Sequence, residues 1–266
     1  MATNRTSADR VRALGVMVDA VNFDQALERL AHWLADSDAA CRFVVTPNLD
    51  HAVLLRTHSG LRAVYADASL IIADGMPMVW ASRLNRGPLR ERVTGSDLVP
   101  GLLAKHRGTE KLRVYLLGAA PGVAERAADN VHRQFPNVQV VGTVSPAYGF
   151  EHRADDCREL IAAVNEAAPH LLIVGLGAPK QELWLHKHAQ ALKVRVAICA
   201  GATIDFLAGE RSRAPRLMQR TGTEWLYRAL SEPRRLIPRY AKDMLHLPGL
   251  LYGDWKSRSA SEPSAD

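Results

Sequence analysis

Short apolar runs alternate with longer amphipathic stretches along residues 11–210. Runs rich in Val, Ile and Leu predict buried strands, whereas apolar residues spaced three and four apart predict helices. The predicted strands are Arg42–Thr46, Leu70–Ala73, Leu112–Leu117, Val138–Val144, Leu171–Gly175 and Val194–Ala200. The predicted helices are Asp24–Leu34, Leu49–His58, Ser96–Lys105, Gly122–Gln134, Asp155–Ala167 and Lys180–Leu192. This alternation predicts an α/β fold, doubly wound and Rossmann-like, with a mostly parallel sheet and helices on both faces.

The predicted domain boundary lies where this alternation of strands and helices stops. We predict an α/β core over residues 11–210 and a basic helical C-terminal appendage over residues 211–256, made of short helices broken by prolines. The two ends, residues 1–10 and 257–266, have the small and polar composition of disordered termini.

The positive charge is concentrated in the appendage. Residues 1–210 hold 23 Lys and Arg against 22 Asp and Glu, whereas residues 211–258 hold 11 against 4, interleaved with Trp, Tyr and Leu. Such a segment is attracted to an anionic surface, whether lipid headgroups, nucleic acid or a diphosphate. No apolar run is long enough to span a bilayer and no signal peptide is evident, so the expected compartment is the cytoplasm.

Asp74 is the candidate general base. It follows the predicted strand Leu70–Ala73 and precedes Gly75, and ligands of parallel α/β sheets bind at the carboxyl ends of the strands. A carboxylate there can remove a proton from a hydroxyl nucleophile. The alternative is an Asp-Gly turn in which the side chain bonds its own backbone.

Thr46 and Asn48 end the preceding predicted strand. Neighbouring parallel strands end at the same edge of the sheet, so these polar groups are predicted to face the same crevice as Asp74. The alternative is that Asn48, or Asp50 after it, serves as the N-cap of the helix that follows.

Two glycine-rich turns follow other strands. Gly118 lies in one, and Gly177 in the other, just before Lys180 and Gln181. Free N–H groups at such turns can bind phosphate, and Lys180 and Gln181 add a cation and an amide. Neither turn has the G-x-G-x-x-G spacing, so tight packing of helix on strand is the alternative interpretation.

Five arginines could neutralise a diphosphate, although each could equally be solvated or salt-bridged. They are Arg92, Arg228, Arg234, Arg235 and Arg239. The chain has one D-x-D motif, Asp36-Ser37-Asp38, and it follows a predicted helix rather than a strand. We therefore predict no metal site.

Taken together, these loops resemble the WecG/TagA/CpsF family of bacterial glycosyltransferases over roughly residues 14–240. The resemblance is carried, in order, by Thr46-Pro47-Asn48, Asp74-Gly75, Glu91-Arg92-Val93-Thr94-Gly95, Gly175-Leu176-Gly177-Ala178-Pro179-Lys180-Gln181-Glu182, Gly201-Ala202-Thr203-Ile204-Asp205-Phe206, Arg213-Ala214-Pro215 and Glu224-Trp225-Leu226-Tyr227-Arg228.

The resemblance implies an inverting, metal-independent enzyme that needs no cofactor. It would move an N-acetylmannosamine-type sugar from a UDP-sugar donor to an undecaprenyl-diphosphate-linked sugar acceptor, for cell-surface polysaccharide or teichoic acid-type synthesis. The appendage would dock on the inner face of the cell membrane, and the chain could form a homo-oligomer. The identity of the donor sugar stays open for two reasons. Some relatives transfer glucose or uronic sugars, and Met76-Pro77-Met78 is bulkier than the small residues associated with this position.

The resemblance also implies roles for individual residues. Asp74 would be the base, Thr46 and Asn48 would line the acceptor side, and Arg92 would assist the leaving group. On the UDP-sugar side would lie Gly118, Gly177, Lys180, Gln181, Gly201 and Asp205, with Asp205 near the uracil. Arginines of the appendage such as Arg228 would complete the site.

Two other functions remain as alternatives. A nucleotide-binding module or oxidoreductase is disfavoured by the missing G-x-G-x-x-G motif and acidic partner. A nucleic-acid-binding protein is suggested by the sequence pI of about 9.4, but the charge is confined to a segment that also carries Trp and Leu. We therefore expect no nucleic acid partner.

Overall fold

The computed structural model describes residues 10–37, 40–84, 88–106, 108 and 110–260. Its centre is a six-stranded sheet, all parallel, in the order β4-β3-β8-β7-β5-β6. The strands are β3 (Arg42–Val45), β4 (Leu70–Ile71), β5 (Leu112–Gly118), β6 (Val138–Val144), β7 (Leu171–Gly175) and β8 (Val196–Cys199). All six predicted strands are present, and the predicted fold class is confirmed.

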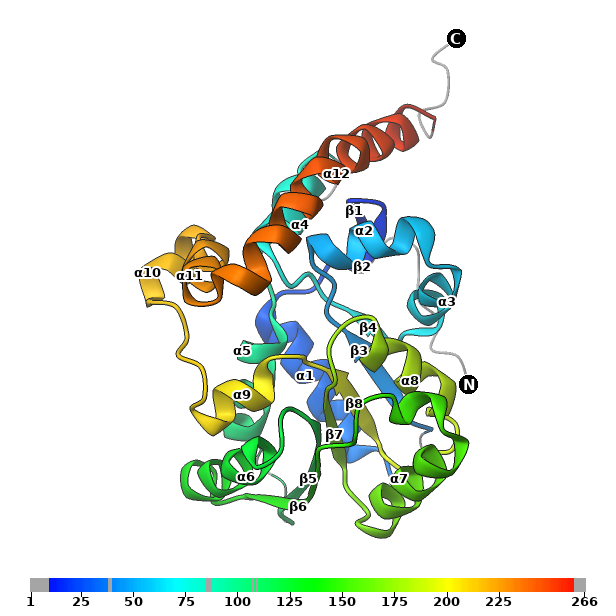
Figure 1. Cartoon of the computed structure of the whole chain (residues 1–266), viewed down its shortest axis with the longest axis vertical. Helices are drawn as coiled ribbons and strands as arrows, with labels where there is room; N and C mark the ends of the chain where they lie inside the picture. The colour runs from blue at the N-terminus through cyan, green and yellow to red at the C-terminus, as the bar shows by residue number, and fades with distance from the viewer. Residues whose placement is uncertain (1–9, 38–39, 85–87, 107, 109, 261–266) are drawn as a thin grey trace.

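Helices cover both faces of the sheet (Figure 1). One face packs against α1 (Phe23–Ala35), α5 (Gly95–Lys105), α6 (Val123–Gln134) and α9 (Thr203–Ala208). The other packs against α2 (Leu49–Thr57), α3 (Ser59–Asp67), α7 (Ala154–Glu166) and α8 (Lys180–His188), with the short η2 (Phe150–His152) beside α7. Successive strand residues point to opposite faces, so Val44 joins one core and Val45 the other. This is why the strands are continuous apolar runs.

The sequence patterns missed a small antiparallel hairpin, β1 (Arg10–Ala13) and β2 (Val16–Asp19). Four-residue strands are too short to give a clear periodic signal. The hairpin is tied to the sheet because the buried carboxylate of Asp19 accepts a hydrogen bond from the Ile71 backbone N–H at 2.7 Å. The prediction also lacked α3 and α4 (Met76–Ser82).

The appendage consists of α10 (Arg216–Thr221), α11 (Glu224–Ser231) and α12 (Pro233–Ala260). The prediction of short helices broken by prolines is right for the first two and wrong for α12. This helix has 28 residues and continues through Pro238 and Pro248. Each interior proline removes one backbone hydrogen bond, and we attribute the continuity to burial of Leu236 and Leu250 and to packing of α12 against α2.

The predicted termini need adjustment. Residue 10 lies in β1, and α12 extends through residues 257–260, so these positions are ordered parts of the fold. Residues 1–9 and 261–266 lie outside the described residues. In the part of the chain that the structure describes, no helix is both long and apolar enough to cross a membrane.

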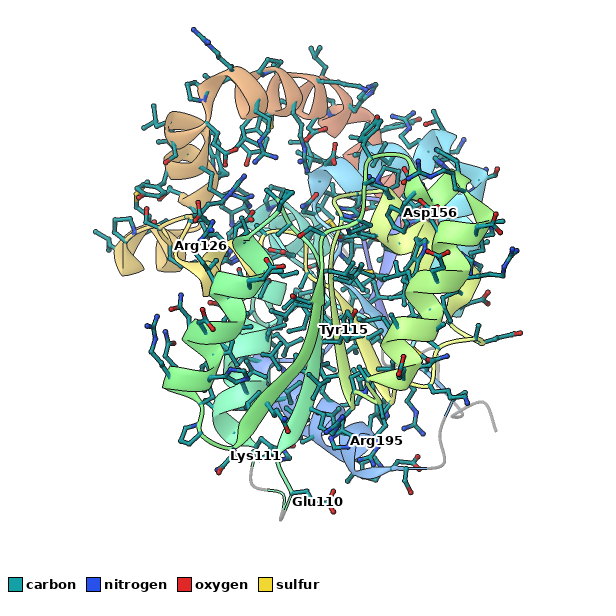
Figure 2. All side chains as sticks on the ribbon, turned by 60° about the horizontal axis from the view of Figure 1, so that its bottom comes forward. Glu110, Lys111, Tyr115, Arg126, Asp156 and Arg195 are labelled. Atoms are coloured by element: carbon teal, nitrogen blue, oxygen red, sulfur yellow. The ribbon has the colours of Figure 1, made fainter. Side chains whose placement is uncertain are left out.

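The two ends of the sheet face different surroundings. Figure 2 shows Glu110, Lys111 and Arg195 at the end remote from the appendage. The appendage lies beyond the carboxyl ends of the strands, where Arg239 of α12 forms an ion pair with Asp50 at 2.8 Å. The loops after β3 and β4 therefore lie next to the appendage, where Asp50 pairs with Arg239 and Met76 lies beside Gly222.

Candidate active site

Asp74 lies where three loops meet at the edge of the sheet. Its backbone N–H donates to the carbonyl of Pro47 at 2.8 Å, which ties the loop after β4 to the loop after β3. The carbonyl of the preceding Ala73 accepts from Val93 at 3.1 Å, which adds the segment before α5. Gly75 has a φ of +154°, so a side chain there would strain the turn that leads into α4.

The environment of Asp74 suits a base. Burial raises the pKa of this carboxyl to about 6, although the positive charges of Arg92 and Arg228 act in the opposite direction. Within the described residues the carboxylate accepts no hydrogen bond, so the alternative of a self-bonded Asp-Gly turn is not observed. A carboxylate with a pKa near 6 is ionised at neutral pH and more basic than an ordinary aspartate.

Thr46 is committed to the scaffold. Its side chain is buried, and its hydroxyl donates to the carbonyl of Cys199 at 3.0 Å, which links the ends of β3 and β8. Its methyl group packs toward Gly95 at the start of α5. Thr46 lies at the strand end, as predicted, but its hydroxyl hydrogen is used by the Cys199 carbonyl, so toward a substrate the oxygen could act only as an acceptor.

Asn48 is the N-cap of α2, as the alternative interpretation held. Its Oδ1 accepts from the backbone N–H groups of Asp50 at 3.1 Å and His51 at 3.4 Å. The side chain also lies beside the Asp74 loop, because a Cβ on Gly75 would be 3.5 Å from the Asn48 Cβ. Capping and a role in the site are therefore compatible.

A buried polar network that sequence reasoning missed connects Asn48 with Gln181. The imidazole of His51 contacts Asn48 Oδ1 at 3.0 Å through Nδ1 and Glu182 Oε1 at 3.2 Å through Nε2. Gln181 donates to the same Glu182 oxygen at 2.7 Å and accepts from the Gly177 N–H at 3.2 Å. His51, Gln181 and Glu182 are all buried.

The charges of this network are coupled. Burial by itself disfavours a charged imidazole, but the hydrogen bond and negative charge of Glu182 raise the pKa of His51. Burial likewise opposes the charged form of Glu182, yet the hydrogen bond and charge of His51 lower its pKa overall. His51 and Glu182 therefore favour the ionised state as a pair.

The predicted donor glycines lie at the converging ends of β5, β7 and β8. A Cβ on Gly118, whose φ is +117°, would lie 2.4 Å from the carbonyl oxygen of Gly175, so tight backbone packing explains this glycine. Gly201 lies beside Gln181, because a Cβ there would be 3.6 Å from its Oε1. Lys180 forms an ion pair with Glu151 at 3.6 Å rather than pointing freely into the loop.

The five arginines fall into distinct environments. Arg92 forms an ion pair with Glu224 at 2.9 Å, and Arg239 pairs with Asp50 across α12 and α2. Arg235 pairs with Glu232 at 2.6 Å, and Arg234 is exposed. Arg228 is half-buried, and within the described residues it forms no hydrogen bond or ion pair. Its charge acts on Asp74, so it is the available cation next to the base.

A cavity of about 310 Å³ lies between α11 and the segment that leads out of α9. Its lining consists of Phe206, Glu210, Arg211, Ser212, Tyr227, Arg228, Ser231 and Glu232. Asp205 flanks it and forms an ion pair with Arg211 at 3.1 Å. Burial raises the pKa of Asp205, against the opposing charge of Arg211. The cavity is lined by two aromatic rings, two serine hydroxyl groups, two arginines and two glutamates, and Arg211 already pairs with Asp205 and Glu232.

The D-x-D motif is separate from this region. Asp36 ends α1 and forms an ion pair with Arg42 at 2.7 Å, and Asp38 lies outside the described residues. Among the residues that the structure describes, no group of three or more His, Cys, Asp and Glu side chains is arranged to hold a metal ion.

Comparison with known proteins identifies the family. The model of the glycosyl transferase WecG/TagA/CpsF family matches residues 11–261. A protein of Bacillus spizizenii is 33% identical over 208 residues, covering 76% of this chain and 78% of its own length. A protein of Staphylococcus aureus strain MRSA252 is 29% identical over 232 residues, covering 87% and 89%. Both are named N-acetylglucosaminyldiphosphoundecaprenol N-acetyl-beta-D-mannosaminyltransferase. This chain therefore belongs to the WecG/TagA/CpsF family of glycosyltransferases.

Proposed function

We propose that this enzyme transfers N-acetylmannosamine from its UDP derivative to N-acetylglucosamine linked through a diphosphate to undecaprenol, with inversion at the transferred carbon. The substrates follow from the names of the two relatives and from the family motifs. The observation that supports the proposal best is Asp74, which lies at a strand end with its pKa raised to about 6 by burial. A base of this kind suits the deprotonation of a sugar hydroxyl.

The chemical step needs only groups that the chain and its substrates supply. The acceptor hydroxyl oxygen attacks the anomeric carbon of the donor as Asp74 takes the hydroxyl proton. The bond from that carbon to the diphosphate breaks on the opposite face, and UDP leaves with the electron pair. Arg228 and Arg92 would stabilise the negative charge that develops on the diphosphate.

The donor would occupy the cavity beside α11. Arg228 lines this cavity and also acts on Asp74, so a diphosphate there would lie between the nucleoside end and the base. Asp205, beside the cavity, would face the uracil, and the loop that carries Gly177 and Gln181 would contact the sugar. Asn48 would approach the acceptor from the other side of Asp74.

We further propose that the appendage binds the inner face of the cell membrane. Large apolar side chains are exposed along α11 and α12: Trp225, Leu226, Leu230, Ile237, Met244, Leu245, Tyr252 and Trp255. Basic residues lie among them, which is the composition of an interfacial segment. Co-sedimentation with anionic and zwitterionic vesicles tests this: binding that requires anionic lipid supports it, and equal absence from both pellets contradicts it.

The test of the transfer reaction is UDP release by the purified protein with a short-chain lipid-diphosphate-linked N-acetylglucosamine acceptor. The donors would be the UDP derivatives of N-acetylmannosamine, N-acetylglucosamine, glucose and glucuronic acid, each with and without EDTA. With UDP-N-acetylmannosamine we expect UDP release that depends on the acceptor and that EDTA does not change. Preferred release from UDP-glucose or UDP-glucuronate would instead identify a glucosyl- or uronosyltransferase, and no release would contradict the proposal.

A further inference from the structure

We propose that His51 is a positioning residue that, as an imidazolium, fixes the amide of Asn48 so that its NH2 group faces the acceptor beside Asp74. The inference rests on the proposed function for the identity of the acceptor. The ionic state of His51 and the orientation of Asn48 follow from contacts within the chain.

The orientation of Asn48 is set by three donors on one oxygen. The backbone N–H groups of Asp50 and His51 and the Nδ1 of His51 all lie within hydrogen-bond distance of Asn48 Oδ1. A flipped amide would place NH2 against those donors, which is unfavourable. The Asn48 Nδ2 therefore points away from the cap. Within the described residues it has no hydrogen-bond partner, and it is not among the buried unpaired atoms, so it retains some solvent-accessible surface.

The ionic state of His51 follows from what faces its two nitrogens. Nδ1 lies 3.0 Å from Asn48 Oδ1, and Nε2 lies 3.2 Å from a carboxylate oxygen of Glu182. Both partners are acceptors, so both ring nitrogens need a hydrogen. The backbone N–H of Asn48 also points to Nδ1 at 3.5 Å, the capping-box contact that a neutral ring with its only hydrogen on Nε2 would accept. The contact to Oδ1 is shorter at 3.0 Å and favours a hydrogen on Nδ1 instead.

The burial of Glu182 also requires a positive charge on His51. It is fully buried, and its second oxygen, Oε2, has no hydrogen-bond partner in the described part of the chain. A protonated Oε2 would be a donor without an acceptor, whereas an ionised carboxylate needs a nearby cation. His51 is the cation in contact with it. The other charged groups that act on His51 are Asp50 on α2, Arg239 and Asp243 on α12, and Asp74 in the loop after β4.

The position of His51 connects both substrate sides of the site. Its charge acts on Asp74 and favours the ionised base. Through Glu182 it also holds Gln181, whose carbonyl oxygen is bonded to Gly177. Loss of His51 should therefore reduce turnover and weaken use of the acceptor, and it should move the titration of Asp74 to higher pH.

A test that does not depend on activity is the protonation state of His51. In protein labelled with ¹⁵N-histidine, the ring signals lost in His51→Gln identify this residue. We expect both ring nitrogens to carry hydrogen at pH 7.5 in the wild type, and a neutral ring at that pH in Glu182→Gln. A neutral His51 in the wild type at pH 7.5 overturns the proposal whether or not the protein transfers sugar.

The kinetic test is a double-mutant cycle between His51→Gln and Asn48→Ala. If His51 acts through Asn48, then His51→Gln should lower turnover about tenfold in the wild type and less than threefold in the Asn48→Ala background. The KM for the acceptor should rise more than that for the donor, because His51 contacts Asn48 directly and Gln181 only through Glu182. In His51→Gln the acid limb of the pH–rate profile should move to higher pH, because losing a cation near Asp74 raises the pKa of that carboxyl.

Controls separate positioning from folding. His186 of α8, which pairs with Asp67 at the end of α3, provides His186→Gln as a matched variant that should leave all parameters unchanged. Equal losses from His51→Gln in both backgrounds, or an unmoved acid limb, would show that His51 only supports the fold. If His51→Gln does not fold, the ring signals of His51 are assigned through its own backbone resonances in the wild type, and their pH dependence in the wild type still decides the ionic state. If the wild type transfers no sugar, the proposed function fails while the ring measurement still tests this inference.

Discussion

The strand-end edge of the core and the appendage hold their polar groups in different ways. In the core, Thr46 is bonded to a strand carbonyl, and Asn48 is bonded to a helix terminus and to His51. The appendage contacts the core through single ion pairs of both polarities: Arg239 of α12 pairs with Asp50, and Glu224 of α11 pairs with Arg92 of the core. The core therefore provides fixed geometry, and the appendage brings charge to it.

The difference has an energetic reason. A buried polar group without a partner costs about 1–3 kcal/mol, so the core groups have little freedom to move. A partly exposed ion pair such as Arg239 with Asp50 contributes about 0–1 kcal/mol and is weakened by salt, so this contact is easily exchanged. An anionic substrate or membrane surface can compete for such arginines without disturbing the base.

The largest expected effect tests the core. Replacing Asp74 by Asn removes the carboxylate at nearly constant shape, and turnover should fall at least about 100-fold, the scale of a lost general base. UDP binding should persist, because the donor cavity and Arg228 are unchanged. The measurement is UDP release with acceptor, together with calorimetric titration of UDP. Asp129→Asn, on the exposed side of α6, is the control; full turnover in Asp74→Asn would remove this residue from the mechanism.

The same substitution should make the protein more stable above pH 6. Burial raises the pKa of Asp74 to about 6 from its ordinary value of 3.8, so the folded state disfavours the ionised form. Wild-type stability relative to Asp74→Asn should fall as pH rises from about 4 to 6 and then stay constant, by up to about 3 kcal/mol. Thermal unfolding from pH 4 to 8 measures this. A constant difference between the two proteins across that range would contradict the raised pKa.

Arg228 tests whether the charge from the appendage is functional. Arg228→Ala should reduce kcat/KM about 10- to 100-fold, because a cation that neutralises the leaving diphosphate is lost. Arg228→Lys should recover part of it, since the charge remains but the planar fork does not. Steady-state kinetics with varied donor measures both. Arg234→Ala, an exposed arginine of the same appendage, should change little; equal losses from Arg228→Ala and Arg234→Ala would reduce the appendage to a nonspecific basic surface.

At Asp254, α12 is held to the rest of the chain by buried hydrogen bonds, as the polar groups of the core are. It is fully buried and accepts hydrogen bonds from the backbone N–H groups of Leu14 at 2.5 Å and Gly15 at 2.8 Å. Asp254→Ala leaves these donors without that partner, so the free energy of unfolding should fall by about 2 kcal/mol, with little change of kcat below the transition. Chemical denaturation measures it against Asp129→Ala. A decrease in the free energy of unfolding below about 0.5 kcal/mol would mean that α12 is held to the core only by easily exchanged contacts.

The smallest effect concerns Asp50 and Arg239. Their side chains are 20% and 36% exposed at a distance of 2.8 Å, so solvent screens much of the attraction. A double-mutant cycle of Asp50→Asn and Arg239→Met in unfolding experiments should give a coupling of about 0.5 kcal/mol that decreases in high salt. A coupling above about 2 kcal/mol, unaffected by salt, would mean that α12 is held to the core as firmly as the strands hold one another.

Much of the fold could be predicted because the sheet is buried on both faces. The predicted bounds of Val138–Val144 and Leu171–Gly175 match β6 and β7, since continuous apolar runs between turns are a strong local signal. The hairpin and the length of α12 could not be predicted. The strands of the hairpin are too short to show a period, and the prolines of α12 are compensated by packing that no local pattern contains.

The sequence by itself determined the parallel α/β core, the basic appendage, and the loops that carry Asp74, Asn48 and Arg92, because these depend on local composition and on the strand-end rule. Only the tertiary structure decided which side chains meet. His51 and Glu182 are separated by 131 positions, and although Glu182 ends one of the motifs that carry the resemblance, no local pattern pairs it with His51. Their pairing arises from how α2 and α8 pack at one edge of the sheet. The packing of α11 at the same edge brings the charge of Arg228 close to Asp74.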